Sequence, residues 1–178
     1  CVFAYSDVPY QRVMAVSAIV NAAGANFSLL GWKETMIKST KPVIAVGAVR
    51  TGGGKSEASR RIVDELKKRG LKVIAIRHPM PYGNLVKQAV QRFETIDDLS
   101  KHECTIEEME EYEPHVVRDT IIYSGIDYEA ILRQAESDPR GCDVILWDGG
   151  NNDFPFIKPD LMITLVDPQR AGHEQRYY

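Results

Sequence analysis

Residues 42–70 read PVIAVGAVRTGGGKSEASRRIVDELKKRG and contain the strongest local signals in the chain. A continuous apolar run over residues 43–49 is typical of a strand that is buried on both faces. Apolar residues then recur at helical spacing from Ala58 to Leu66, and Gly70 follows where such a helix should end. The segment therefore predicts a strand, a glycine-rich turn and a helix in direct succession.

The turn between this strand and helix reads TGGGKS, residues 51–56. Backbone N–H groups in such a turn, together with the helix dipole, favour bound phosphate. Lys55 is expected to reach the β- and γ-phosphates and Ser56 a magnesium ion, as in a P-loop. Val49 stands where the strict pattern has glycine, so the loop is a variant, and a glycine-rich turn without a ligand is the alternative. The predicted nucleotide-binding residues are Thr51, Gly52, Gly53, Gly54, Lys55, Ser56 and Glu57.

A second block, VILWDGGNND, occupies residues 144–153. An apolar run that ends in Asp148 is the Walker B arrangement, in which the carboxylate helps to hold Mg²⁺ opposite the P-loop serine. The pattern is weak alone and becomes specific because it follows the glycine-rich loop in the required order. We predict that Ser56 and Asp148 hold Mg²⁺ and that Asn151 and Asn152 contact the substrate, with a simple turn as the alternative for the asparagines.

A third candidate segment follows the next predicted strand, residues 71–76. Arg77 and His78 come directly after that strand and precede PMPYG, whose prolines make a rigid excursion. Ligands collect at such strand ends in α/β sheets. We therefore predict that Arg77, His78 and Tyr82 contact an anionic substrate, and a surface ion pair is the alternative for Arg77.

The next part of the chain is charge-rich. Residues 84–93 predict a helix, and the acidic stretch after them predicts a lid-like insertion over the site. Within it, Thr105 is expected to cap a short helix over residues 106–112, which Pro114 ends. Glu103 is a candidate Mg²⁺ ligand, with Glu107 as a further magnesium or water partner. A metal site made by His102, Cys104 and His115 stays open, although the spacing fits no standard zinc pattern.

The remaining segments complete an α/β pattern. Residues 1–31 predict a βαβ unit, and residues 32–40 a linker, so that a domain boundary is expected near residue 40. Residues 41–178 predict a nucleotide-binding domain with a mostly parallel sheet flanked by helices, incomplete at its C-terminal end. Its later elements are expected to be a strand over residues 117–123, a helix over 128–136 capped by Asp127, and a strand over 161–166.

Composition excludes several classes of protein. The net charge of −3 gives no electrostatic basis for binding nucleic acid, and no apolar stretch approaches the roughly 20 residues that a membrane span needs. The three cysteines, Cys1, Cys104 and Cys142, are odd in number and widely spaced, which favours a reducing cytoplasm. The sequence starts within a predicted strand without an initiator Met and stops after a loop, so we expect a piece of a longer protein.

Seven blocks over nearly the whole chain carry a family resemblance: AVRTGGGKS (48–56), IRHPMPYG (76–83), KHECTIEE (101–108), YEPH (112–115), DYEAIL (127–132), ILWDGGNNDFPF (145–156) and KPDL (158–161). Together they resemble cyclic 2,3-diphosphoglycerate synthetases. The resemblance implies a P-loop fold of the class that contains dethiobiotin synthetase and the metallochaperone GTPases. It also implies an ATP- and Mg²⁺-dependent ligase that closes a phosphoanhydride ring within 2,3-diphosphoglycerate and releases ADP and phosphate.

This reaction suits the available side chains, because a polyanionic substrate needs several cations. Lys55, Arg50 and Asp148 are the predicted catalytic residues, with Arg50 stabilising the transferred charge. The predicted substrate-binding residues are Arg77, His78, Tyr82, Arg92, Asn151 and Asn152. A GTPase or metallochaperone-like switch and a ligase acting on a different acid remain alternatives, so the choice between ATP and GTP stays open. The expected partners are a nucleoside triphosphate and a small phosphorylated acid, and a homodimer is an option.

Overall fold

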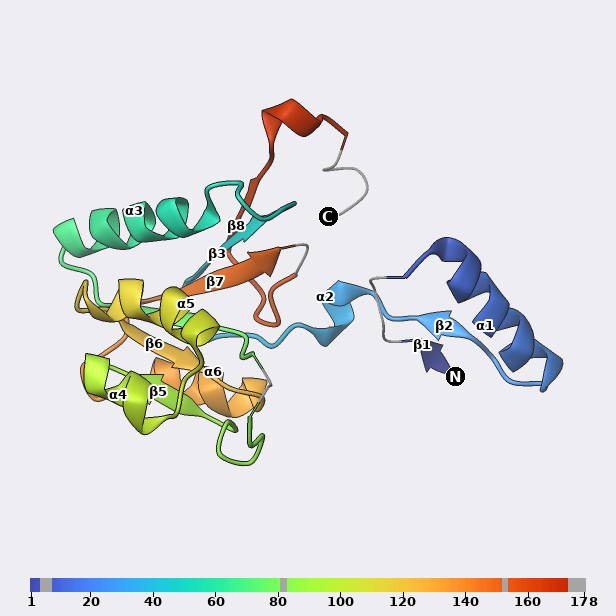
Figure 1. Cartoon of the computed structure of the whole chain (residues 1–178), viewed down its shortest axis with the longest axis horizontal. Helices are drawn as coiled ribbons and strands as arrows, with labels where there is room; N and C mark the ends of the chain where they lie inside the picture. The colour runs from blue at the N-terminus through green and yellow to red at the C-terminus, as the bar shows by residue number, and fades with distance from the viewer. Residues whose placement is uncertain (4–7, 81–82, 152–153, 173–178) are drawn as a thin grey trace. The chain divides into compact units, whose positions relative to one another are not determined.

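The computed structural model describes residues 1–3, 8–80, 83–151 and 154–172, and it forms two compact units, Cys1–Met36 and Ile37–Tyr178 (Figure 1). The division falls before the predicted boundary near residue 40. The reason is that Ile37 bridges to Ile157, and Ser39 donates a hydrogen bond to Glu136, both within the second unit. None of the described helices combines the length and apolar character that a membrane span requires.

The first unit is the predicted βαβ arrangement. Its elements are β1 (Val2–Phe3), α1 (Tyr10–Ala22), β2 (Ser28–Leu29) and a short α2 (Trp32–Thr35). The two strands pair in parallel, with Val2 opposite Ser28.

The second unit is a six-stranded sheet in the order β5-β6-β4-β7-β3-β8. Its strands are β3 (Val43–Ala48), β4 (Val73–Arg77), β5 (Gln91–Phe93), β6 (Ile121–Ser124), β7 (Val144–Asn151) and β8 (Leu161–Leu165). Its helices are α3 (Lys55–Lys68), α4 (Ile96–Lys101), α5 (Ile106–Val116), α6 (Tyr128–Glu136) and the short 3-10 helix η1 (Pro168–Arg170). All strand pairs are parallel except β5 with β6, so the predicted fold class is confirmed.

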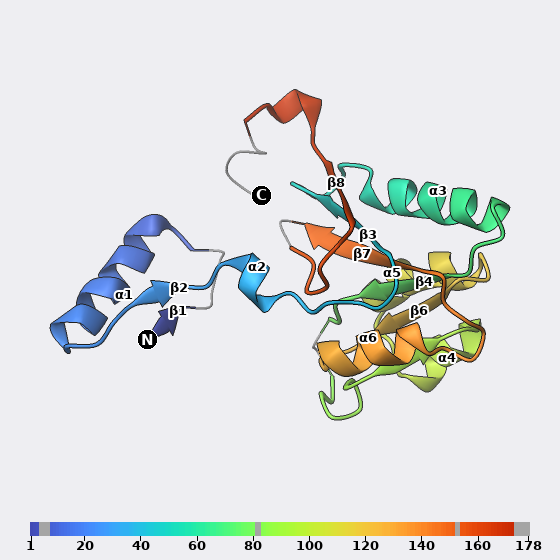
Figure 2. The same cartoon turned by 180° about the vertical axis from the view of Figure 1, so that it is seen from behind.

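Helices cover both faces of this sheet. Ala75 lies in register with Leu146 and Ile122, and these residues pack on the face that α3, α4 and α5 cover. Ile145 points to the opposite face and packs in one core with Ile131 of α6. Figure 1 shows α4 and α5 in front of the sheet, and Figure 2 shows α6 in front of it. Because side chains alternate along a strand, Asp148 faces the same side as Leu146, toward α3 and α5.

The strand order brings the candidate segments together. Strand β7 lies between β3 and β4, although it follows both in the sequence. The carboxyl ends of these three parallel strands therefore meet at one edge of the sheet, as ligand sites in α/β folds require. The register of β7 shifts against β3 just after Asp148, since Val46 faces Asp148 and Ala48 faces Asn151. This irregularity contains Gly149 and Gly150.

Two sequence-based expectations are corrected here. The helix predicted over residues 84–93 is wrong, because residues 91–93 form β5 and pair with β6, and Val86 is exposed. Pro114 does not end the helix predicted over residues 106–112. This helix, α5, continues to Val116, and the Val117 N–H still donates to the Glu113 carbonyl at 2.9 Å. The Thr105 cap is confirmed by its hydrogen bonds with Glu108.

The acidic insertion packs firmly into the domain. Tyr112 and Val116 of α5 are buried in a common core with Phe93, and Leu99 of α4 joins them. The Tyr112 hydroxyl also lies 2.9 Å from the Ser124 hydroxyl of β6. The insertion borders the site, and its movement as a lid stays a prediction.

Gly149 is required by the shape of β7. A Cβ atom at this position would overlap the indole ring of Trp147, which is fully buried. We expect Gly149→Ala to lower the free energy of unfolding by about 1–3 kcal/mol, the usual range for overpacking a filled core. Urea denaturation followed by circular dichroism measures the change. Gly83→Ala is the control, because its Cβ would meet Gln88 only at ordinary contact distance, and equal losses for both variants would contradict the prediction.

Candidate functional site

The site is built around the carboxylate of Asp148, a residue within β7 that is only 2% exposed. Ser59 donates to one carboxylate oxygen at 2.7 Å, and the Lys55 ammonium lies 3.7 Å from the same atom. The other oxygen lies 3.0 Å from Nε2 of His115 and 3.3 Å from Nη1 of Arg77. One buried carboxylate thus joins α3, β4, α5 and β7.

The glycine-rich loop places Lys55 at this carboxylate. Gly52 and Gly54 have φ values of +83° and +87°, a left-handed conformation that glycine adopts without steric cost. Gly54 is the N-cap of α3, and Lys55 is the first helical residue, with a buried side chain. Ser56 and Glu57 follow in the exposed first turn. The predicted strand, loop and helix are therefore confirmed, and Lys55, Ser56 and Asp148 lie together.

Arg77 lies in the site but is held by protein carboxylates. Its side chain is 5% exposed, and Nη2 lies 2.9 Å from Oε1 of Glu111, while Nη1 contacts both the carbonyl and the carboxylate of Asp148. Arg77 therefore lies beside Asp148 at the end of β4, and its contact with an anionic substrate stays a prediction. The charge of Arg77 is already matched by Glu111 and Asp148. The alternative for Arg77 was an ion pair at the surface, and the structure shows an ion pair that is buried.

Burial and the charges of this network together shift the pKa values of Asp148 and Lys55. Burial raises the pKa of Asp148, but the hydrogen bond from His115 and the charges of His115, Lys55 and Arg77 outweigh it and hold that pKa well below its usual range. Burial lowers the pKa of Lys55, against the opposing attraction of Asp148. Asp148 therefore stays ionised, and its charge offsets the cost of burying the cations around it.

Asp148→Asn should test this network through stability. The variant leaves Lys55 buried without its counter-charge and Arg77 paired with Glu111 alone, so at pH 7 we expect a loss of about 3–5 kcal/mol in the free energy of unfolding. The folded pKa of Asp148 is depressed. Its ionisation therefore contributes stability above the unfolded value of about 3.9 and loses it as the pH falls.

The difference between wild type and Asp148→Asn should consequently shrink below about pH 4. Urea denaturation at pH 7 and at pH 3 measures it. Asp97→Asn, an exposed residue in the first turn of α4, is the control and should change stability little at either pH. A loss for Asp148→Asn that stays the same at both pH values would contradict the assigned charge network.

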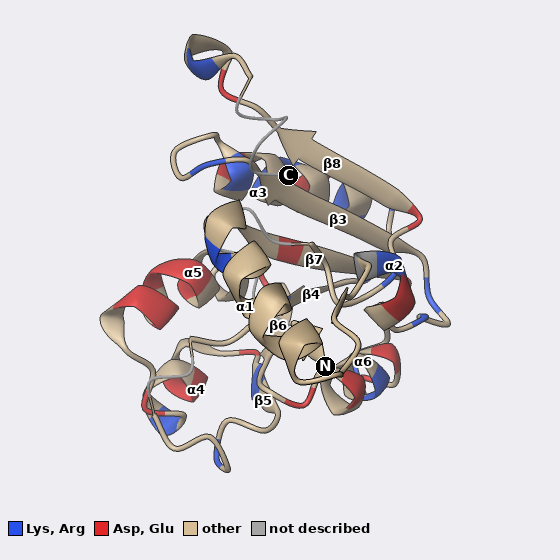
Figure 3. Cartoon of the chain, turned by 90° about the vertical axis from the view of Figure 1, so that its right-hand side faces the viewer, with Lys and Arg blue, Asp and Glu red and all other residues tan. Residues whose placement is uncertain are grey.

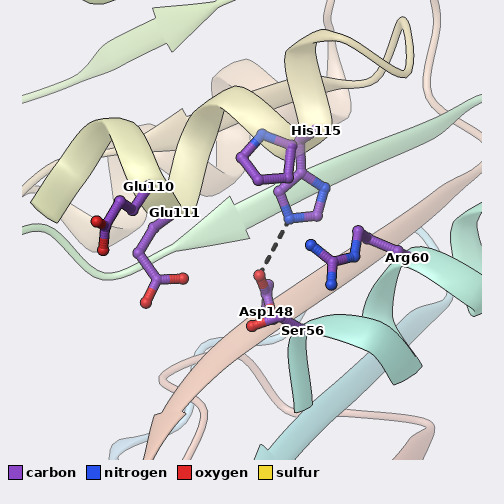
Figure 4. Close-up of a pocket in the computed structure, with 7 residues that line it drawn as sticks. Ser56, Arg60, Glu110, Glu111, His115 and Asp148 are labelled. Atoms are coloured by element: carbon purple, nitrogen blue, oxygen red, sulfur yellow. Dashed lines mark hydrogen bonds and ion pairs between the residues drawn. The ribbon is translucent and has the colours of Figure 1, made fainter. Parts of the chain in front are cut away.

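A cavity of about 220 Å³ opens beside Asp148. Its lining residues are Ser56, Arg60, Glu110, Glu111, Pro114, His115 and Asp148. Figure 4 shows Arg60 reaching into it from α3, with Glu110 and Glu111 reaching toward it from α5. Figure 3 shows how strongly acidic α5 is. One wall of the cavity thus comes from α3 and another from α5 of the acidic insertion.

Ser56 and Asp148 could hold Mg²⁺ only together with phosphate and water, as in a P-loop. Among the described residues, no group of three or more His, Cys, Asp and Glu side chains could hold a metal ion. Mg²⁺ in such sites takes one or two protein ligands, and phosphate and water supply the rest. Ser56 and Asp148 line the same cavity and meet that requirement.

The other predicted metal ligands are not brought to the site. Glu103 makes an exposed ion pair with Lys87 at 3.1 Å. The ring of His102 packs edge-on against Phe93, while His115 bonds to Asp148, so the set of His102, Cys104 and His115 does not form a metal site.

Arg92 is also placed elsewhere than predicted. Its guanidinium bonds to Asp138 at 2.6 Å and to Glu94 at 2.6 Å, and Tyr123 donates to the same Asp138 carboxylate. These contacts tie β5 to β6 and to the turn after α6, which gives Arg92 a structural role.

The remaining predicted residues lie at the strand ends. Arg50 and Thr51 belong to the turn after β3, and His78 follows β4. Asn151 ends β7. The predictions for Tyr82 and Asn152 lie outside the described residues.

Sequence reasoning missed Ser59, Arg60 and Glu111, and it weighed His115 only as a metal ligand. The available signal was spacing, because Glu111 and His115 lie one turn apart on α5 and Ser56 and Arg60 one turn apart on α3. Spacing alone could not show that these two helix faces meet.

The comparisons with known proteins concern the sequence and the fold of the chain. No protein-family model matches the chain. Over 177 residues it is 60% identical to a protein named arginine synthetase ArcE from Thermococcus kodakarensis, a match that takes 99% of this chain and 39% of that protein. The chain thus spans about two fifths of the length of this relative.

Among solved structures, the chain resembles LpxK from Aquifex aeolicus, described as an "apo" form in complex with ATP. The TM-score is 0.56 at 16% sequence identity, over 87% of this chain and 45% of that one. This likeness concerns the fold alone, a mostly parallel sheet flanked by helices.

Proposed function

We propose that the chain is the nucleotide-binding part of an ATP-dependent synthetase. The observation that carries the proposal is the buried Lys55–Asp148 pair at the turn that opens α3. The 60% identity to a protein named arginine synthetase supports the reaction class, and the fold shared with a protein solved with ATP supports the nucleotide.

The side chains of the site divide the work as follows. The loop of residues 51–56 cradles the phosphates through its N–H groups, and Lys55 binds the γ-phosphate. Ser56 and Asp148 would hold Mg²⁺, which neutralises phosphate charge. Arg50 lies in the turn after β3 and stabilises the transferred charge. His115 and Ser59 keep the Asp148 carboxylate fixed while Lys55 moves from it to the phosphate.

A synthetase of this class uses ATP to turn a substrate oxygen into a phosphorylated leaving group. A nucleophile then displaces the phosphate, so that ADP and phosphate are released. We propose that the acceptor belongs to arginine formation, by analogy with the named relative. The buried free thiols Cys104 and Cys142 support the proposed cytoplasmic location.

Synthesis of cyclic 2,3-diphosphoglycerate is the second candidate, favoured by sequence blocks such as WDGGNNDFPF and RHPMPYG. Its substrate carries two phosphates and a carboxylate. The proposed anchor Arg77 is already paired with Glu111 and Asp148, which makes this candidate the weaker one. A GTP-dependent switch is a third candidate.

Lys55→Ala should abolish most nucleotide binding. Removing the ammonium deletes a charge-assisted contact to phosphate, so we expect the affinity for Mg²⁺–ATP to fall by about 10- to 100-fold. Isothermal titration calorimetry with ATP and with GTP measures the loss and the base preference. Lys68→Ala is the matched control, because Lys68 lies exposed on the same helix in a surface pair with Glu65. Unchanged ATP affinity in Lys55→Ala would refute the assignment.

The reaction class can be tested in reverse, which requires no knowledge of the acceptor. A reversible arginine-forming synthetase given L-arginine, ADP and phosphate should produce ATP, which a luciferase assay detects, and Lys55→Ala should remove the signal. Phosphorus NMR of a reaction with ATP and 2,3-diphosphoglycerate tests the second candidate. Slow GTP hydrolysis without either product would favour the switch.

A further inference from the structure

The cavity beside Asp148 continues as a groove. A second hollow of about 240 Å³ shares Arg60, Glu110 and Pro114 with the first, so the two adjoin along α5. The groove therefore runs from the proposed phosphate site outward between the lining residues of α3 and α5. Its inner end contains Ser56 and His115.

Two charged side chains, Arg60 and Glu110, lie at the junction of these hollows. Within the described part of the chain, neither Arg60 nor Glu110 makes a side-chain hydrogen bond or an ion pair. Arg61, the next residue on α3, is by contrast paired with Glu65 at 2.8 Å. Figure 4 draws the Arg60 and Glu110 side chains on opposite walls of the cavity, with no bond to the other residues shown.

The rest of the groove is balanced in charge. Glu111 is matched by Arg77 at the inner end, and Asp148 is matched by its surrounding cations. The outer hollow adds Glu113 and Arg118, one charge of each sign. Such a groove suits a ligand that carries both charges, because a polyanion would lie against Glu110 and a simple cation against Arg60.

We propose that this groove binds the second substrate, an α-amino acid, with its carboxylate on Arg60 and its α-ammonium on Glu110. The side chain of the amino acid then extends inward toward Ser56, His115 and Asp148, where phosphoryl transfer takes place. This inference rests on the proposed synthetase function and adds to it the two residues that select the amino-acid substrate.

Calorimetric titration of the purified protein with L-arginine tests the proposal. Arg60→Ala and Glu110→Gln should each weaken binding by about 10- to 100-fold, as expected for the loss of a charge-assisted contact. Arg61→Ala and Glu65→Gln are the matched controls, since both residues lie on α3 in an exposed pair, and they should leave the affinity unchanged.

Two analogues identify which group each residue binds. Agmatine lacks the carboxylate and should bind wild type weakly, with no further loss in Arg60→Ala. The analogue 5-guanidinopentanoate lacks the α-ammonium and should likewise show no further loss in Glu110→Gln. Such non-additive losses are the signature of a direct contact.

Other results would overturn the inference. These are no measurable arginine binding, arginine binding that is insensitive to Arg60→Ala, fully additive losses with the analogues, or Arg60-dependent binding of 2,3-diphosphoglycerate in place of arginine. Titration with Mg²⁺–ATP is run in parallel. Lys55-dependent ATP binding together with any of these results would leave the proposed nucleotide function standing, whereas absent ATP binding would refute that function itself.

Discussion

The buried negative charge of Asp148 in β7 constrains the arrangement of the side chains around it. Removing a carboxylate from water costs several kcal/mol unless cations and hydrogen-bond donors surround it. Asp148 meets this requirement with groups from three other elements, namely Lys55 and Ser59 of α3, Arg77 of β4 and His115 of α5. The acidic insertion is therefore joined to the phosphate loop by a polar contact as well as by its apolar core.

The same network prepares the site for chemistry. Lys55 and Arg77 are largely buried and already held in place, so under the proposed function their charges would need little rearrangement when a phosphate binds. The two cations differ, however, in what else holds them. Among the described residues, Lys55 makes one ion pair, with Asp148 at 3.7 Å, whereas Arg77 also pairs with Glu111 and bonds to a backbone carbonyl. Lys55 is thus the cation that can transfer to a ligand, and Arg77 is the one that stays.

Local patterns in the sequence predicted the fold class, the glycine-rich loop and the strand that contains Asp148, because each is encoded by neighbouring residues. The helix over residues 128–136 was predicted with its cap for the same reason. The helix predicted over residues 84–93 was wrong because the pairing of β5 with β6 outweighed the helical spacing of apolar residues. Arg92 and His115 were misjudged because their partners, Asp138 and Asp148, are distant in sequence, and only the folded chain brings them together.

The position of Arg77 also bears on which substrates the domain can accept. A strand-end arginine beside a phosphate loop would serve a polyanionic substrate well if it faced the cavity. Glu111 instead draws it into the interior, and its side chain is only 5% exposed. Arg60, one turn beyond Ser56 on α3, is then the guanidinium that reaches the cavity, and the carboxylates of α5 lie across from it. Because α5 both pairs with Arg77 and supplies the carboxylates of Glu110 and Glu111, the proposed site would suit a ligand of mixed charge better than a polyanion.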